Sequence, residues 1–168
     1  MQRTDFSLMA CPVARSLDRV GEWWSILILR DAFHGLTRFD QFQKSLQIAP
    51  NMLSRRLANL VESGLLERRP YSEHPPRDEY VLTARGRDFR PVLIALMAWG
   101  NRHFADPEGP SSLMVDAETG LPADPILVDR NTGREIDDTH FKYVAGPAAD
   151  DNVRARIAFV DAQREKTS

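Results

Sequence analysis

The sequence predicts a mainly α fold with a small β-hairpin (α+β), followed by a C-terminal extension containing short strands. Apolar residues recur at helical spacing through most of residues 13–104. Within that stretch, two short strand-like runs are separated by a polar, proline-rich segment. After residue 104, prolines, glycines and acidic residues become frequent. We therefore predict a domain at residues 1–104 and an acidic extension of unknown role at residues 105–168.

The first two helices are predicted from their ends and their apolar pattern. Pro12 suits the first turn of a helix, and Gly21 ends it. The next run, residues 22–33, is apolar nearly all round, which is typical of a helix in a core or an interface. No apolar run approaches the roughly 20 residues that cross a bilayer, and no secretion signal precedes the domain. We expect a cytoplasmic protein.

Two short helices joined by a tight turn are predicted next. Thr37 is the expected N-cap of a helix at residues 38–46, whose apolar side chains share one face. The second helix has Pro50 in its first turn and stops at Gly64. This arrangement is typical of a helix-turn-helix.

A hairpin and a long helix complete the predicted domain. Residues 65–71 and 80–82 are expected to pair as strands. The segment between them, residues 72–77, looks too long and too rich in proline for a tight turn, so we expect an exposed loop, the wing. Thr83 should cap a helix that runs to about Phe104, kinked or broken at Pro91.

The extension is predicted to contain little regular structure. Residues 113–115 and 126–128 are strand candidates, and residues 131–133 form a turn. A last helix is expected at residues 153–163, and no internal repeat is apparent.

The net charge of −2 hides an uneven distribution. Residues 13–104 hold 14 basic and 10 acidic side chains, whereas residues 105–168 hold 7 and 13. A basic module followed by an acidic segment favours a polyanionic partner for the basic module.

The second helix of the helix-turn-helix has an apolar stripe around Leu53 and a polar opposite face. Arginine can pair with guanine and asparagine with adenine, while serine and arginine can hold phosphates. An ordinary solvated face would look similar. Arg77 in the wing favours DNA, because an arginine there can reach a minor groove, although it could instead pair with Asp78 or Glu79. The predicted contacts to double-stranded DNA are Arg38, Asn51, Ser54, Arg55, Arg56, Asn59 and Arg77.

Several segments in order resemble the HxlR family of bacterial regulators. They include Cys11-Pro12-Val13, the run from Trp24 to Asp31, Leu53-Ser54-Arg55-Arg56-Leu57, the run from Pro75 to Thr83, and Trp99-Gly100. The resemblance covers about residues 8–104. It implies a winged helix-turn-helix homodimer that represses or activates transcription, with the N-terminal and last domain helices at the dimer interface. Ala49 departs from the family, which usually offers a serine or threonine cap there.

The resemblance also implies a role for the single cysteine, as a redox sensor. In some HxlR members a cysteine at this position senses oxidants or electrophiles. Cys11 precedes a helix, whose dipole favours a thiolate, and Arg15 and Arg19 follow. The alternative is a small structural residue that fills a gap.

Other chemistry has no signature in the sequence. The four histidines lack metal-ligand spacing, and no glycine-rich phosphate loop appears, so we expect neither an enzyme nor a metal or cofactor. Two alternative functions stay open. One is a regulator that responds to a redox signal or to a small-molecule effector bound in the dimer cleft; the other is a winged-helix protein-interaction module that does not bind DNA.

Overall fold

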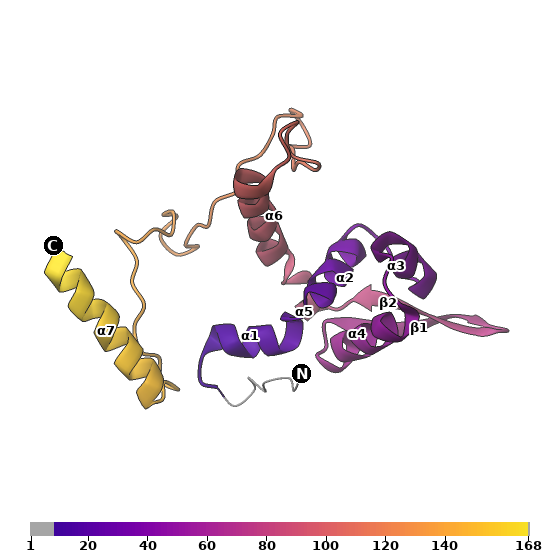
Figure 1. Ribbon diagram of the computed structural model, residues 1–168, viewed down its shortest axis with the longest axis horizontal. Helices are drawn as coiled ribbons and strands as arrows, with labels where there is room; N and C mark the ends of the chain where they lie inside the picture. Colours follow the sequence, from indigo (N-terminus) through magenta and orange to yellow (C-terminus); the bar gives the residue numbers. More distant parts are fainter. Residues whose placement is uncertain (1–8, 168) are drawn as a thin grey trace. The chain divides into compact units, whose positions relative to one another are not determined.

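The computed structural model describes residues 9–167 and divides into two compact units. One unit spans Trp24–Glu135; the other combines the chain up to Trp23 with the chain from Ile136 onward. We describe each unit by itself (Figure 1). No helix in the described part of the chain is long and apolar enough to cross a membrane. The boundary near residue 104 stays a prediction.

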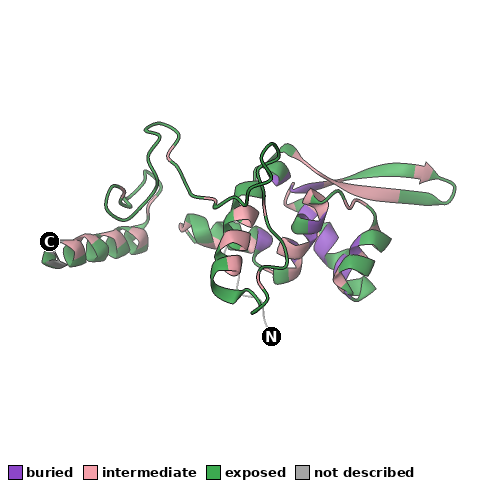
Figure 2. Cartoon of the chain, turned by 90° about the horizontal axis from the view of Figure 1, so that it is seen from above, coloured by how far each residue is buried: buried purple, intermediate pink, exposed green. Residues whose placement is uncertain are grey.

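Three helices form the core of the larger unit: α2 (Trp23–Phe33), α3 (Phe39–Leu46) and α4 (Pro50–Glu62). Most of the buried residues, coloured purple in Figure 2, belong to these helices. Burying a large apolar side chain stabilises a fold by about 1.5–3 kcal/mol, so this cluster accounts for much of the unit's stability. The fully buried apolar side chains of the three helices are Ile28, Leu29, Phe42, Leu53, Leu57 and Leu60.

The prediction that Thr37 caps α3 is wrong. Arg38 is the N-cap residue, and the side-chain oxygen of Gln41 accepts hydrogen bonds from the backbone N–H groups of Arg38 (2.9 Å) and Thr37 (3.0 Å). The carbonyl of Thr37 accepts a 2.7 Å hydrogen bond from the N–H of Tyr80 in the hairpin. This tertiary contact fixes the entry to α3. As the departure at Ala49 suggested, α4 starts without a side-chain cap.

The hairpin is longer and its turn tighter than predicted. Strands β1 (Leu66–Glu73) and β2 (Pro76–Leu82) pair antiparallel, with a bulge between Pro70 and Ser72. The expected loop at residues 72–77 is wrong, because only His74 and Pro75 lie between the strands, and their peptide bond is cis. Each strand of a two-stranded ribbon has an outer edge where an N–H needs no partner, so prolines fit. The hairpin still projects as a wing (Figure 1).

The long helix predicted after the hairpin is broken in two. Helix α5 (Ala84–Arg87) begins at Thr83, whose hydroxyl accepts a 3.0 Å hydrogen bond from the N–H of Gly86, as predicted. Pro91 stands in the first turn of α6 (Arg90–Phe104), which confirms the break. No side chain of α6 is fully buried within the single chain.

The chain after α6 contains two matching turns instead of two strands. Residues 113–115 and 126–128 each contribute only one isolated β-bridge, at Val115 and at Val128. The strand prediction is therefore wrong. The two turns share the pattern Val-Asp-x-x-Thr-Gly, at residues 115–120 and 128–133. The prediction that the chain contains no internal repeat is therefore also wrong.

In each of these turns the aspartate accepts hydrogen bonds from the threonine three residues later. The partners are Asp116 with Thr119 and Asp129 with Thr132. Such local bonds compete with a strand ladder. The hydrogen bonds from Thr119 also hold the pKa of the Asp116 carboxyl below its usual value.

The smaller unit contains α1 (Pro12–Val20) and α7 (Asp151–Thr167). Helix α1 matches its prediction. Helix α7 begins earlier than the predicted residue 153, because the carboxylate of Asp150 accepts a 2.8 Å hydrogen bond from the N–H of Val153 and satisfies the first turn.

Candidate nucleic-acid interface

Helix α4 presents a polar face to solvent because its leucines bury the opposite side. Asn51, Ser54 and Arg55 are exposed, and Asn59 is half-buried. Asn51 uses its side-chain oxygen locally, accepting a 2.8 Å hydrogen bond from the N–H of Met52, which leaves its amide N–H groups for a partner. Within the described residues, Arg55 makes no hydrogen bond or ion pair.

Arg56 does not share this exposed face. Its side chain is only 4% exposed, although it was predicted to contact DNA. At 100° per residue, Arg56 lies about 60° from Leu53, inside the arc that the helix buries. In this conformation Arg56 is part of the packed side of α4, and a contact with DNA stays an untested prediction.

Most arginines of the wing are paired within the hairpin. Arg68 forms an ion pair with Asp78 on the opposite strand, and Arg69 forms one with Glu67 on its own strand. The sequence left open the alternative that Arg77 pairs with Asp78 or Glu79. Asp78 forms its ion pair with Arg68 instead. Arg77 is exposed and forms no ion pair with any described residue.

Arg38 connects the start of α3 with the wing. Its guanidinium carbon lies 4.5 Å from the centre of the Tyr71 ring, a distance typical of a cation–π contact. The backbone of Arg38 also pairs with that of Glu79 in β2, as an isolated antiparallel β-bridge. The residue pattern did not single out Tyr71, because the hairpin holds a second tyrosine, Tyr80, and nothing local distinguishes the two.

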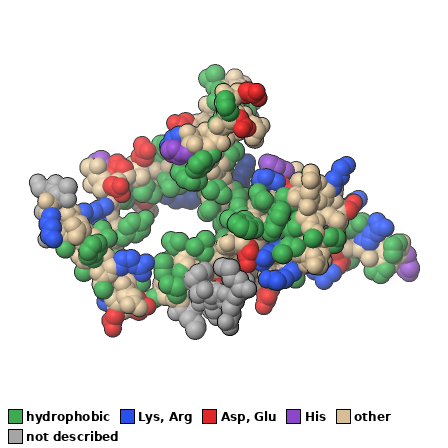
Figure 3. All heavy atoms as spheres, in the orientation of Figure 1, with side chains coloured by type: hydrophobic (Ala, Val, Ile, Leu, Met, Phe, Trp, Pro, Cys, Tyr) green, Lys and Arg blue, Asp and Glu red, His purple; other side chains and the backbone are tan. Residues whose placement is uncertain are grey.

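Of the residues predicted to contact DNA, Arg56 is buried and the others are at least partly exposed. In Figure 3, basic side chains, coloured blue, lie over the hairpin and the helices beside it, with acidic groups between them. The described residues contain no cluster of three potential metal ligands. Exposed polar or basic groups on α4, at the start of α3 and in the wing could bind a polyanion; these are Arg38, Asn51, Ser54, Arg55 and Arg77.

Helix α6 carries an exposed apolar stripe. Val92, Leu96 and Trp99 follow one another at helical spacing, and their exposed fractions are 52%, 46% and 53%. Large apolar side chains that gather on one exposed face are typical of a protein–protein interface.

Cys11 is the N-cap residue of α1 and is half-buried. A hydrogen bond from the backbone N–H of Ala14 lowers the pKa of its thiol, opposed in part by desolvation. Smaller contributions come from Val13 and from Arg156 of α7, whose guanidinium nitrogen lies 4.0 Å from the sulfur. The position therefore stabilises a thiolate.

Comparison with known proteins gives consistent results. The family described as HxlR-like helix-turn-helix matches residues 19–108. A protein of Mycobacterium tuberculosis named as an uncharacterised HTH-type transcriptional regulator, Rv3095, is 44% identical over 135 residues, which cover 80% of this chain and 85% of the relative.

Solved structures extend the similarity. PA1374 of Pseudomonas aeruginosa, described as a candidate transcription factor, is 55% identical over 87% of this chain and 99% of its own, with a TM-score of 0.62. For PA1607, also described so, the identity is 39%, the coverage 85% and 100%, and the TM-score 0.75. The oxidised form of the redox regulator HypR is 31% identical over 57% of this chain and all of its own, with a TM-score of 0.53.

Proposed function

Because the chain belongs to the HxlR-like helix-turn-helix family of transcription regulators, we propose that it binds specific double-stranded DNA as a homodimer. In this proposal α4 enters the major groove and the wing lies near the minor groove. The observation that supports it most is the pair Arg55 and Arg77. Both guanidinium groups are exposed and form no ion pair with a described residue, and they extend from the two elements that meet DNA in winged-helix docking.

Each residue has a proposed role that follows from its donors and acceptors. Arg55 would read a guanine, and the amides of Asn51 and Asn59 would read adenines. Ser54 and Arg38 would hold phosphates, which positions the dimer without reading sequence. Arg77 would lie in the minor groove. Arg56, while it stays buried, would support α4 from its packed side.

The test compares two arginine variants on a duplex selected from random DNA by the parent protein. Arg55→Ala should weaken specific binding by about 1–3 kcal/mol and relax the base preference at one position per half-site. Arg77→Ala should weaken binding to most sequences alike and reduce the salt slope, because fewer counterions are released.

Arg130→Ala is the matched control, since Arg130 is an exposed arginine outside the proposed interface. It should bind the selected duplex as the parent does. If Arg55→Ala and Arg77→Ala also bind like the parent, the interface is elsewhere. If the parent itself selects no duplex, specific DNA binding is refuted, and a protein-interaction module is the alternative that is left.

A second candidate function is regulation by oxidation at Cys11. It is favoured by the lowered pKa of the thiol and by the likeness to HypR, which is described as a redox regulator. A peroxide would take two electrons and two protons from two thiols, which join as a disulfide while the peroxide is reduced to water or an alcohol. The partner would be Cys11 of the other copy or a small thiol, because the chain has one cysteine.

A further inference from the structure

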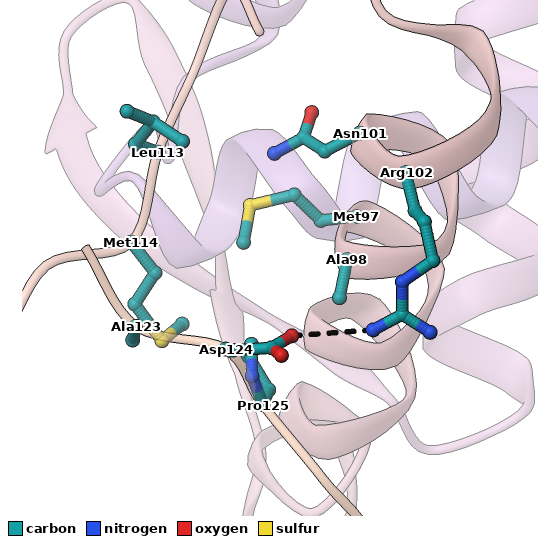
Figure 4. Close-up of a pocket in the computed structure, with 9 residues that line it drawn as sticks. All are labelled: Met97, Ala98, Asn101, Arg102, Leu113, Met114, Ala123, Asp124 and Pro125. Atoms are coloured by element: carbon teal, nitrogen blue, oxygen red, sulfur yellow. Dashed lines mark hydrogen bonds and ion pairs between the residues drawn. The ribbon is translucent and has the colours of Figure 1, made fainter.

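A cavity of about 270 Å³, partly open to solvent, lies between the second half of α6 and the chain that follows it, all within the larger unit (Figure 4). The helix forms one wall, and the chain on both sides of the first Val-Asp-x-x-Thr-Gly turn forms the other. The lining residues are Met97, Ala98, Asn101, Arg102, Leu113, Met114, Ala123, Asp124 and Pro125.

Specific contacts hold the second wall against the helix. The side-chain amide of Asn101 donates a 2.9 Å hydrogen bond to the carbonyl of Ser112. Arg102 forms a 3.2 Å ion pair with Asp124. Between these two contacts, the N–H of Ala123 donates a 2.9 Å hydrogen bond to the carbonyl of Met114, which closes the turn. The return chain is therefore fastened to α6 at two points, and the cavity lies between them.

The lining of the cavity indicates the class of ligand. Two methionine thioethers, Met97 and Met114, extend into the region between the walls, and sulfur contacts aromatic rings favourably. The side chains of Ala98 and Ala123 are small, so room for a ligand remains between the two walls. Arg102 and Asp124 neutralise each other, so the cavity offers no net charge.

The side chain of Asn101 offers a neutral polar atom that can orient a ligand. The side-chain oxygen of Asn101 makes no hydrogen bond with a described residue, while its nitrogen is engaged by Ser112. That oxygen can accept a hydrogen bond from a hydroxyl or an N–H. The volume lies below the usual range for drug-sized ligands, which is about 300–1,000 Å³, and therefore favours a single ring.

We propose that this cavity is an effector site for a small neutral aromatic molecule that carries one hydrogen-bond donor. The binding site stands on the cavity alone; its role as an effector site rests on the proposed DNA-binding function. Met97 and Asn101 lie on the opposite side of α6 from the apolar stripe of Val92, Leu96 and Trp99. A ligand that joins the return chain to α6 would therefore act on the helix proposed to form the dimer.

The test uses the full chain labelled with ¹³C at the methionine methyl groups, with phenol as the probe. Phenol should shift the methyl signals of Met97 and Met114 in a saturable manner, with a Kd on the order of 1 mM, as a ligand of this size supports. Met52 in α4 is the internal control, and its signal should not move. Absence of saturable shifts at Met97 and Met114, or equal shifts at Met52, overturns the site.

Two further measurements identify the cavity. Ala98→Trp fills the space and should abolish the phenol shifts while the Met52 signal stays native; persistent shifts contradict the proposal. Toluene lacks the hydroxyl and should bind the parent less tightly than phenol, a difference that Asn101→Ala should remove. Equal binding of both probes by the parent contradicts the role of Asn101.

A final arm tests the effect on DNA. Phenol at saturating concentration should change the affinity of the parent for its selected duplex at least twofold, and should not change that of Ala98→Trp. If phenol binds but the DNA affinity is constant, the cavity is a binding site without an effector role. If the parent binds no DNA, the proposed function fails while the methionine shifts still decide whether the site exists.

Discussion

Neighbouring residues of α4 have opposite surroundings, although their chemistry is the same. Arg55 is exposed, whereas Arg56 is buried beside the leucines. A rotation of about 100° per residue separates them, so adjacent positions on a helix lie on different faces. Cys11 shows a similar dependence on place. Its pKa is lowered because its sulfur accepts hydrogen bonds from the first turn of α1, most strongly from Ala14.

The surroundings of Cys11 lead to a prediction about its reactivity. The thiolate is the reactive form, and a lowered pKa keeps it populated to lower pH. The rate of alkylation by iodoacetamide should therefore reach its plateau at lower pH in the folded protein than in urea. Arg156→Ala should raise the pKa only slightly, because the Ala14 hydrogen bond is the larger cause.

The same residue should control the response of DNA binding to oxidation. Mild peroxide treatment with a small thiol should lower the affinity of the parent for its selected duplex, but not that of Cys11→Ser. Equal responses of the two proteins, or a Cys11 that resists alkylation in the folded state, would assign the cysteine a structural role.

At the scale of elements, the wing and the start of α3 form one assembly. The hydrogen bond between Tyr80 and Thr37 and the contact between Arg38 and Tyr71 join them. The bulge between Pro70 and Ser72 contains Tyr71, which places this residue outside the regular register of the hairpin. The position of Arg38 therefore depends on a strand more than 30 residues away in the sequence.

This assembly predicts that Tyr71 positions Arg38. An exposed cation–π contact contributes about 0.5–1 kcal/mol, so Tyr71→Ala should weaken DNA binding by a similar amount. Tyr71→Phe keeps the ring and should bind like the parent. In the Arg38→Ala background, Tyr71→Ala should have no further effect. Competition titrations on the selected duplex would measure the parent and the four variants, and a Tyr71→Phe variant as weak as Tyr71→Ala would refute the positioning role.

At the scale of the whole molecule, charge and apolar surface are unevenly distributed. The first 104 residues hold the basic excess, and the remaining 64 hold the acidic excess. Phosphate groups attract the basic excess and repel the acidic excess. We therefore expect bound DNA to lie against residues of the first segment and away from the acidic extension. The apolar stripe of α6 is uncovered in the single chain, and a two-fold partner would bury it.

The stripe predicts the state of association. The parent should be a dimer at micromolar concentration, with half-sites about 34 Å apart or a multiple of that spacing. Leu96→Asp places a charge in the proposed interface and should give a monomer by light scattering, together with weaker DNA binding. Ile126→Asp is the matched control, because Ile126 is exposed outside α6. A parent that is monomeric at this concentration would exclude the homodimer.

The sequence by itself determined the fold class and the order of the elements from residue 12 to residue 104. Helical spacing of apolar residues, the prolines in first turns and the break at Pro91 are local properties, because steric limits and burial act within a few residues. The exposed face of α4 followed from the same periodicity. The family was also recognisable from its motifs, as the match to residues 19–108 confirms.

Only the tertiary structure decided the details that depend on distant partners. The start of α3 is fixed by Tyr80, and Arg68 rather than Arg77 takes Asp78 across the hairpin. The cavity beside α6 exists because Asn101 and Arg102 hold a chain segment that returns after a turn. Such contacts join residues ten or more positions apart. Their partners depend on how the chain folds back, which no local periodicity specifies.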